Sequence, residues 1–324
     1  MRSSRHVRHV RRVRRVGLVL GVLTCIGTSC TGDGDGGGDD GDGDGDSGDT
    51  LGDADAGSST AAASGSGADT ATATETADPG GTPTVDAPPP IRSTGADQER
   101  DLIRPDDPSS FGCLVDLPVG PGEFYDKVSD QLLFPEQTFY YEARYTDGAT
   151  VQIRVHPDLA EDVAGGREQA MRIAGPIGLL PAELRADITR VGFLDGDATA
   201  QGDGGGEGIH VYEDNVTLRE STNRFEETMF HESVHTSLDD RWALSDEWLD
   251  ARSADGVFLT EYAADFPEQE DLAETALYAW ALLHHPDRVS DADAATWRSL
   301  VPNRIAVVEQ ILSAPAVAPG DAGC

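Results

Sequence analysis

The sequence is poor in positive charge. Its 324 residues include 24 lysines and arginines against 59 aspartates and glutamates, which gives a formal net charge of −35. Proteins that bind nucleic acid or anionic membrane surfaces neutralise phosphates with clustered basic side chains. The composition therefore argues against both kinds of partner.

Long apolar runs are also lacking. The run from Val16 to Ile26 has eleven residues, whereas a membrane-spanning helix needs about 20. Residues 1–30 contain seven arginines and no acid, so together they are typical of a signal peptide. The following Gly27-Thr-Ser-Cys30 resembles a bacterial lipobox, which implies that Cys30 carries a lipid anchor and the protein is an exported lipoprotein. Gly27 stands where that motif usually has leucine, so free secretion is the alternative.

Cysteine is scarce as well, with four in the chain. Cys25 lies in the predicted signal peptide and Cys30 is the predicted lipidation site, which leaves Cys113 and Cys324 in the folded domain. An oxidising compartment favours a disulfide between these two, which would tie the start of the folded domain to its last residue.

Large apolar side chains are rare between residues 31 and 108. Residues 31–90 hold fourteen acids and no lysine or arginine, and residues 31–108 as a whole are predicted to be a disordered acidic linker. Its first part, Asp33–Asp46, could attract calcium, but it has neither the glutamate nor the flanking helices of an EF-hand, so a solvated spacer is favoured. Residues 109–324 remain as one domain, long enough to bury a core.

The pattern of this domain predicts an α+β fold. Residues 138–145 and 150–156 alternate like strands around the hairpin turn Asp147-Gly148, and residues 188–194 and 208–212 also resemble strands. Helical patterns follow at residues 166–174, 181–186, 245–252, 268–285 and 294–312, the last broken at Pro302. We expect a small mixed sheet packed on the helix described next, and a mostly helical C-terminal half.

The most informative motif is His231-Glu232-x-x-His235. On a helix, residues i and i+4 share one face, so both imidazoles can reach one metal ion. Glu232 projects beside them, where it can take a proton from metal-bound water. Nitrogen and oxygen ligands without redox chemistry favour a single Zn²⁺ per chain.

The flanking residues predict that this motif is helical. Thr222 or Asn223 could cap the helix, and Glu226 and Glu227 would lie near its positive N-terminus. An apolar stripe recurs every fourth residue, at Phe230, Val234 and Leu238.

A catalytic zinc site needs a third protein ligand. The metzincin class would have a histidine six residues after His235, where this chain has Arg241. Glu270 and Glu274 instead lie one turn apart on the helix predicted downstream. Other acids left open for this role are Asp239, Asp246, Glu247 and Glu261, and His210 is a further possible ligand. His284 and His285 are better explained as residues that end a helix.

The series Tyr262…Glu270-Asp-Leu-Ala-Glu274, together with the histidine motif, resembles the gluzincin zinc metallopeptidases, and within them the lethal-factor-like branch. The resemblance covers residues 225–285. It implies a zincin-like fold, with Glu270 as the third ligand, Glu274 supporting the site from behind, and Tyr262 donating to the oxyanion.

The function predicted from these residues is zinc-dependent hydrolysis of a peptide bond, with Glu232 as general base and a peptide or protein as substrate. Two alternatives remain. One is a non-catalytic, surface-anchored binding lipoprotein that retains the zinc helix. The other is a zinc hydrolase that acts on something other than peptides.

Overall fold

The computed structural model describes residues 88–203, 208–312 and 322–324, all within one compact unit. The strands are β1 (Phe111–Asp116), β2 (Phe124–Asp126), β3 (Gln131–Leu133), β4 (Phe139–Tyr145), β5 (Thr150–Val155), β6 (Arg190–Leu194), β7 (Gln201–Asp203) and β8 (Gly208–Tyr212). The helices are α1 (Val163–Leu179), α2 (Ala182–Arg185), α3 (Glu213–Ser221), α4 (Phe225–Ser237), α5 (Asp239–Trp242), α6 (Asp246–Asp255), α7 (Glu261–Asp265), α8 (Asp271–His284), α9 (Asp291–Leu300) and α10 (Pro302–Ile311). Short 3₁₀ turns are η1 (Ala96–Gln98), η2 (Pro157–Leu159) and η3 (Pro286–Arg288).

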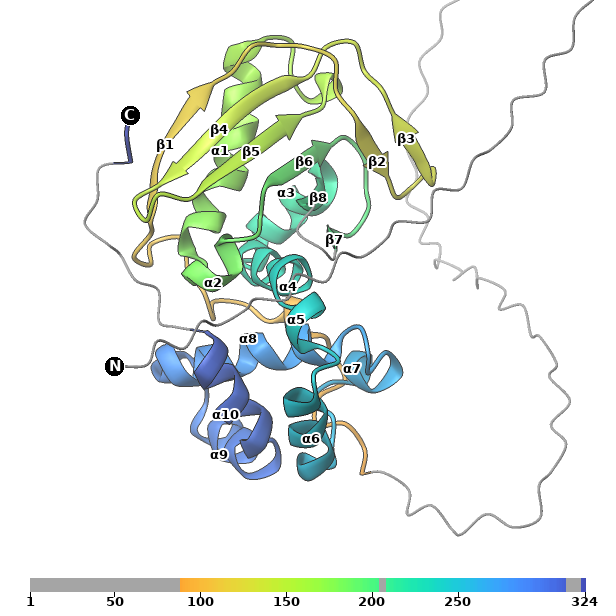
Figure 1. Ribbon diagram of the computed structural model, residues 1–324, viewed down its shortest axis with the longest axis vertical. Coiled ribbons are helices and arrows are strands. Elements are labelled where there is room, and N and C mark those ends of the chain that lie inside the picture. Colours follow the sequence, from red (N-terminus) through yellow and green to blue (C-terminus); the bar gives the residue numbers. More distant parts are fainter. Residues whose placement is uncertain (1–87, 204–207, 313–321) are drawn as a thin grey trace, which may run out of the picture. The chain divides into compact units, whose positions relative to one another are not determined.

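Six strands form one mixed sheet in the order β1-β4-β5-β6-β8-β7 (Figure 1). The first three pair antiparallel, β5, β6 and β8 run parallel, and β7 closes the edge antiparallel to β8. The expected hairpin is confirmed, since β4 and β5 turn at Asp147-Gly148, where Gly148 has a φ of +89° that suits glycine. Strand β4 is alternately buried and half-buried, so one face of it packs on α1.

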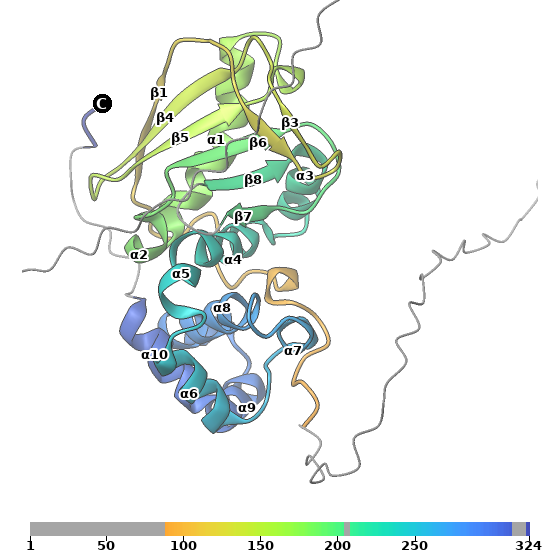
Figure 2. The ribbon, with the colours of Figure 1, turned by 45° about the vertical axis from the view of Figure 1, so that its right-hand side comes forward.

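Helix α4 lies between the sheet and the C-terminal helices (Figures 1 and 2). It contacts α1, α2, α3, β7 and β8 on the sheet side, and α8 and η1 on the other. Every residue of α4 except His235 is buried, which is more than the single apolar stripe of the sequence predicts. The helix therefore holds its polar groups in the interior, where each needs a partner.

The start of α4 differs from the prediction. The helix follows Arg224, whose side chain makes no capping bond. Thr222 ends the preceding helix α3 instead, and its hydroxyl donates to the carbonyl of Leu218. Asn223 takes a left-handed φ of +54° that turns the chain from one helix into the next. Both predicted caps are wrong because α3 was not anticipated.

The C-terminal half is helical, as expected. Helix α8 packs on α4 and on α10. It begins at Asp271, three residues later than the predicted 268. In place of the predicted last helix there are two helices, α9 and α10, which are separated just before Pro302. Arg304 of α10 is fully buried and pairs with Asp255 and Asp271, which fixes α10 against α6 and α8.

The predicted boundary between linker and domain is wrong, because the folded domain begins earlier in the chain. Residues 88–108 were assigned to the linker, but Ala96, Leu102 and Ile103 are buried in the core. Ile91 and Arg92 also donate backbone hydrogen bonds to the segment before α7. This stretch has few apolar residues, because polar contacts rather than buried side chains hold much of it in place. The rest of the expected linker and the signal segment, with Cys30, lie outside the described residues.

Cys113 of β1 and Cys324 are joined in a disulfide, as the sequence predicted. The bond closes a loop between residues 211 positions apart. Within the described part of the chain, no helix is long and apolar enough to cross a membrane.

Candidate metal centre

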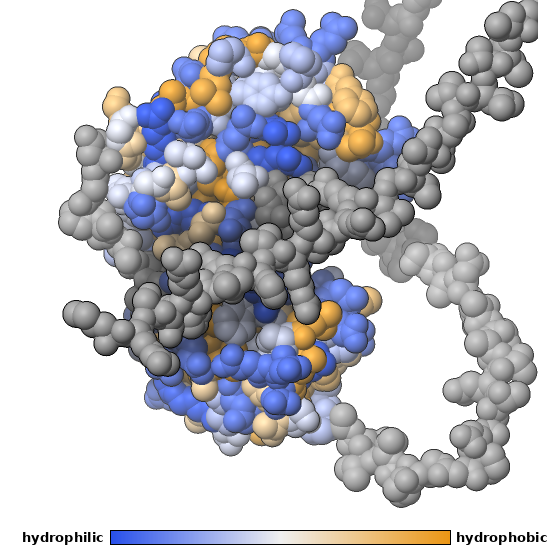
Figure 3. All heavy atoms as spheres, in the orientation of Figure 1, coloured by the Kyte–Doolittle hydropathy of each residue, from blue (hydrophilic) through white to orange (hydrophobic). Residues whose placement is uncertain are grey.

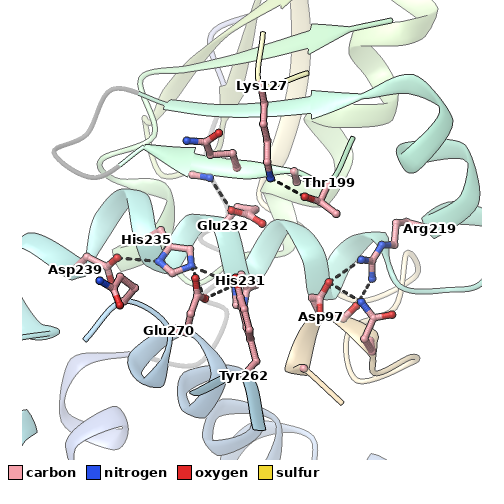
Figure 4. A pocket seen from close by; sticks show the side chains of 16 residues that line it. Asp97, Lys127, Thr199, Arg219, His231, Glu232, His235, Asp239, Tyr262 and Glu270 are labelled. Carbon is pink, nitrogen blue, oxygen red and sulfur yellow. Dashed lines mark hydrogen bonds and ion pairs between the residues drawn. The ribbon is translucent and has the colours of Figure 1, made fainter. Parts of the chain in front are cut away.

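Two imidazoles meet on the face of α4 that turns away from the sheet (Figure 4). His231 and His235 are one helical turn apart, and their Nε2 atoms are 3.1 Å from each other. Glu270, the residue that caps α8, brings Oε2 to 3.3 Å from the Nε2 of His231 and 3.2 Å from that of His235. Within the described residues these three form the one group of His, Cys, Asp or Glu side chains placed to share a metal ion.

The spacing of these atoms can be compared with a metal site. Two ligands bonded at about 2.0–2.1 Å to a tetrahedral ion lie about 3.3 Å from each other. The three separations in the chain are 3.1, 3.2 and 3.3 Å. The Oε2 atom of Glu270 is buried and has no hydrogen-bond partner among the described residues. The donor set therefore fits a small tetrahedral ion.

A carboxylate lies behind each imidazole. Asp239 Oδ2 is 2.8 Å from the Nδ1 of His235, and Glu274 Oε1 is 3.4 Å from the Nδ1 of His231. Such partners hold the proton on Nδ1 and leave Nε2 with a free lone pair. Three acceptors then converge, two nitrogens and a carboxylate oxygen, and only a cation between them relieves that arrangement.

When no metal is bound, protons on the imidazoles supply the positive charge between these acceptors. Burial by itself lowers the pKa of His231 and His235, but the carboxylates around them outweigh it and raise both pKa values. Burial likewise acts to raise the pKa of Glu270, yet the two imidazoles pull it well below the usual range for a glutamate. The cluster thus stabilises positive charge at its centre.

Glu232 lies on the same helix but outside the ligand group. Its Oε2 accepts a hydrogen bond of 2.6 Å from the backbone N–H of Gly202 in edge strand β7. A Cβ atom at Gly202 would come within 2.2 Å of the carbonyl oxygen of Glu232, so only glycine lets the strand approach this closely. Glu232 therefore faces the cleft with its carboxylate held but not bound in the cluster.

Tyr262 comes from α7, on the opposite side of the cleft from β7 (Figure 4). Its side chain is 43% exposed, and it lines the same cleft as Glu270. Burial of part of the ring, followed by the charge of Glu270, raises the pKa of Tyr262 to about 12. The phenol therefore keeps its proton near neutral pH and can donate it in a hydrogen bond.

These groups line a cleft of about 600 Å³. Its walls come from β7 and the loop before it, from α4, from α7, and from the segment around η1; the lining residues include Gly95, Asp97, Gln98, Lys127, Thr199, Gln201, Arg219 and Gln269. Exposed hydrophobic side chains gather over the β2–β3 hairpin and over α7 (Figure 3), including Val128, Leu132, Phe134 and Phe266. None of these four residues lines the cleft itself.

The other residues singled out from the sequence lie elsewhere. Asp246, Glu247 and Glu261 do not join the group of metal-binding side chains, and Asp239 holds an imidazole rather than completing the ligands. His210 packs edge-on against Tyr125, and His284 and His285 both pack on Trp280. Sequence reasoning missed the role of Asp239, although its i+4 spacing from His235 indicates it. It also missed the segment around η1.

No protein-family model matches the chain, and neither a curated protein nor a solved structure is significantly similar to it. What the site does must therefore be argued from its own geometry.

Proposed function

We propose that the protein is a zinc metallopeptidase with a zincin-like catalytic domain, and that His231, His235 and Glu270 hold one Zn²⁺. One observation carries the proposal: three acceptors converge at tetrahedral spacing while Glu232, next to them, lies outside the ligand group. Nitrogen and oxygen ligands at this spacing, with an open position toward the cleft, are typical of catalytic zinc.

The chain's own residues supply the proton transfers. When bound, zinc would lower the pKa of a water molecule and polarise the substrate carbonyl. Glu232 accepts the proton of the attacking water and passes it to the leaving amine nitrogen. Tyr262, protonated at neutral pH, donates a hydrogen bond to the carbonyl oxygen as negative charge develops there. Tyr262 and Glu270 line the same cleft, which supports this role.

Edge strand β7 supports a peptide as the substrate. It pairs with β8 on one side, and Gln201 and Gly202 line the cleft. An extended peptide can add to such an edge through main-chain hydrogen bonds. The side chains of that peptide would then alternate between the two walls of the cleft. This arrangement favours peptide hydrolysis over other zinc-dependent hydrolysis.

The alternative, a binding lipoprotein without catalysis, has less support. A structural zinc site is usually closed by four protein ligands, whereas this group has three and opens into a cleft. We also propose export, and the disulfide between Cys113 and Cys324 supports it because such bonds persist in oxidising compartments. Attachment to a membrane would then depend on a lipid at Cys30.

The decisive variant is Glu232→Gln. It keeps the shape of the side chain and removes the base, so we expect one zinc per chain by elemental analysis and a loss of peptide turnover of roughly 100-fold or more. Glu261→Gln, an exposed carboxylate on α7, is the matched control. Full turnover by Glu232→Gln on a peptide library would refute the role of Glu232. Absence of zinc from the folded wild type would refute the proposed function.

A further inference from the structure

The segment before β1 reaches the metal centre. Residues 91–103, here called the strap, cross the helical face of the domain between α4 and α8. The strap is attached at both ends. Arg92 exchanges backbone hydrogen bonds with Leu259 and Glu261, and the amides of Leu102 and Ile103 both donate to the buried carboxylate of Glu227. Its middle therefore has a fixed position.

In that middle, the backbone N–H of Ala96 donates a 2.7 Å hydrogen bond to Oε2 of Glu274, and both residues are fully buried. The other oxygen of Glu274 faces the Nδ1 of His231 at 3.4 Å. Neither of these two facing atoms has a hydrogen-bond partner elsewhere in the described residues. A buried polar atom without a partner is costly, so the pair gains by closing into a hydrogen bond.

We propose that the Ala96 amide is a positioning group for the metal ligand His231, acting through Glu274, so that the metal centre is complete only with the strap in place. Glu274 is fully buried on α8, and the Ala96 amide is a fixed backbone donor to its carboxylate. Since the amide fixes one oxygen, the second points at the imidazole. The inference rests on the proposed zinc site.

Ala96→Pro tests the link with little disturbance of the backbone. Ala96 is the first residue of η1, a place that suits proline, and Gly95 before it has φ −64° and ψ 159°, the conformation that proline imposes on its neighbour. The substitution removes the N–H and puts a ring carbon against Glu274. Ala182→Pro, at the start of α2 after Pro181 with φ −52° and ψ 150°, is the matched control, because Ala182 does not line the cleft.

The measurement is zinc affinity of the intact chain by chelator competition. We expect Ala96→Pro and Glu274→Gln each to weaken binding roughly 10–100-fold, the usual cost of losing a group behind a ligand histidine, and Ala182→Pro to change it less than about twofold. Because both substitutions break one chain of contacts, the double variant should bind about as well as Glu274→Gln alone. Additive losses, or wild-type affinity in Ala96→Pro, would overturn the inference.

A second variant covers the case in which Ala96→Pro does not fold, and a second readout covers the case in which the chain binds no zinc. If Ala96→Pro does not fold, Gly95→Ala replaces it, because the added Cβ would lie 2.9 Å from Oδ1 of Asp97 and 3.2 Å from Oε1 of Glu274, so that both carboxylates have to shift. The ¹⁵N shifts of the His231 ring in zinc-free protein report the protonation and hydrogen bonding of its two nitrogens. They should change in Ala96→Pro and not in Ala182→Pro. Wild type without zinc affinity would refute the proposed function, while these shifts would still decide whether the strap positions His231.

Discussion

The buried carboxyl of Glu227 makes the stability of the domain depend on pH in an unusual direction. Its side chain is fully buried on α4, and one oxygen accepts the amides of Leu102 and Ile103 while the other has no partner among the described residues. Burial raises the pKa of Glu227 to about 7, against the two amides, which favour the charged form, and with help from the nearby charge of Glu226.

The size of the effect follows from the shift. Between the ordinary pKa of 4.5 and the folded value of about 7, the folded state holds a proton that the unfolded state has released. The stabilisation from Glu227 is therefore complete below pH 4.5 and is lost as pH rises through 7. A difference of 2.5 pKa units corresponds to about 3 kcal/mol of unfolding free energy.

Glu227→Gln removes the titration and keeps an oxygen for the two amides. Its amide nitrogen is as unpartnered as the oxygen it replaces, which costs the same at every pH. We therefore expect the unfolding free energy of the variant, relative to wild type, to rise by up to about 3 kcal/mol between pH 5 and pH 8.

Urea denaturation at several pH values, with a chelator present to exclude metal-linked protons, would measure this difference. Glu247→Gln, an exposed carboxylate on α6, is the control. A difference between Glu227→Gln and wild type that does not change with pH would show that Glu227 is not neutral in the folded domain, and the reasoning from burial would fail.

Three further predictions concern the centre and the disulfide. Glu270→Ala should abolish stoichiometric zinc binding, whereas the control Glu268→Ala, at an exposed position two residues earlier, should not. If elemental analysis finds equal zinc content in the two variants, Glu270 is not a ligand. Asp239→Ala should weaken zinc binding roughly tenfold without eliminating it, because one ligand imidazole loses its partner; unchanged affinity by chelator competition would argue against that role. Cys324→Ser should lower stability in urea by about 4 kcal/mol, since the bond to Cys113 closes a long loop, and a reductant should then affect wild type alone.

Parts of the fold were predictable because they follow from local pattern. Alternation over residues 138–156 and the Asp-Gly turn were sufficient for the β4–β5 hairpin. Helix α3 was missed because it has few apolar residues, and only Val216 and Arg219 of its nine residues are buried. The strap was missed for a different reason: its partners Glu227 and Glu274 lie 125 and 178 residues away, and backbone amides leave no trace in the sequence.

Some residues of the metal centre could also be predicted from local pattern, and others could not. His231 and His235 share a helix, so their spacing alone predicts that they meet. Glu270 could be named from its resemblance to a family motif, but its place beside them depends on how α8 packs against α4. Edge strand β7 was not among the predicted strands, and nothing local indicated that Gly202 would reach Glu232.

The missing side chain at Gly202 sets the width of the cleft where the chemistry would occur. A larger residue there would collide with a main-chain oxygen of α4, which cannot yield unless the helix itself bends. The strand would have to move outward instead, and with it one wall of the cleft. The absence of a side chain at this one position thus determines how closely the edge of the sheet approaches the helix that carries both histidines, and even alanine there would widen the gap between them.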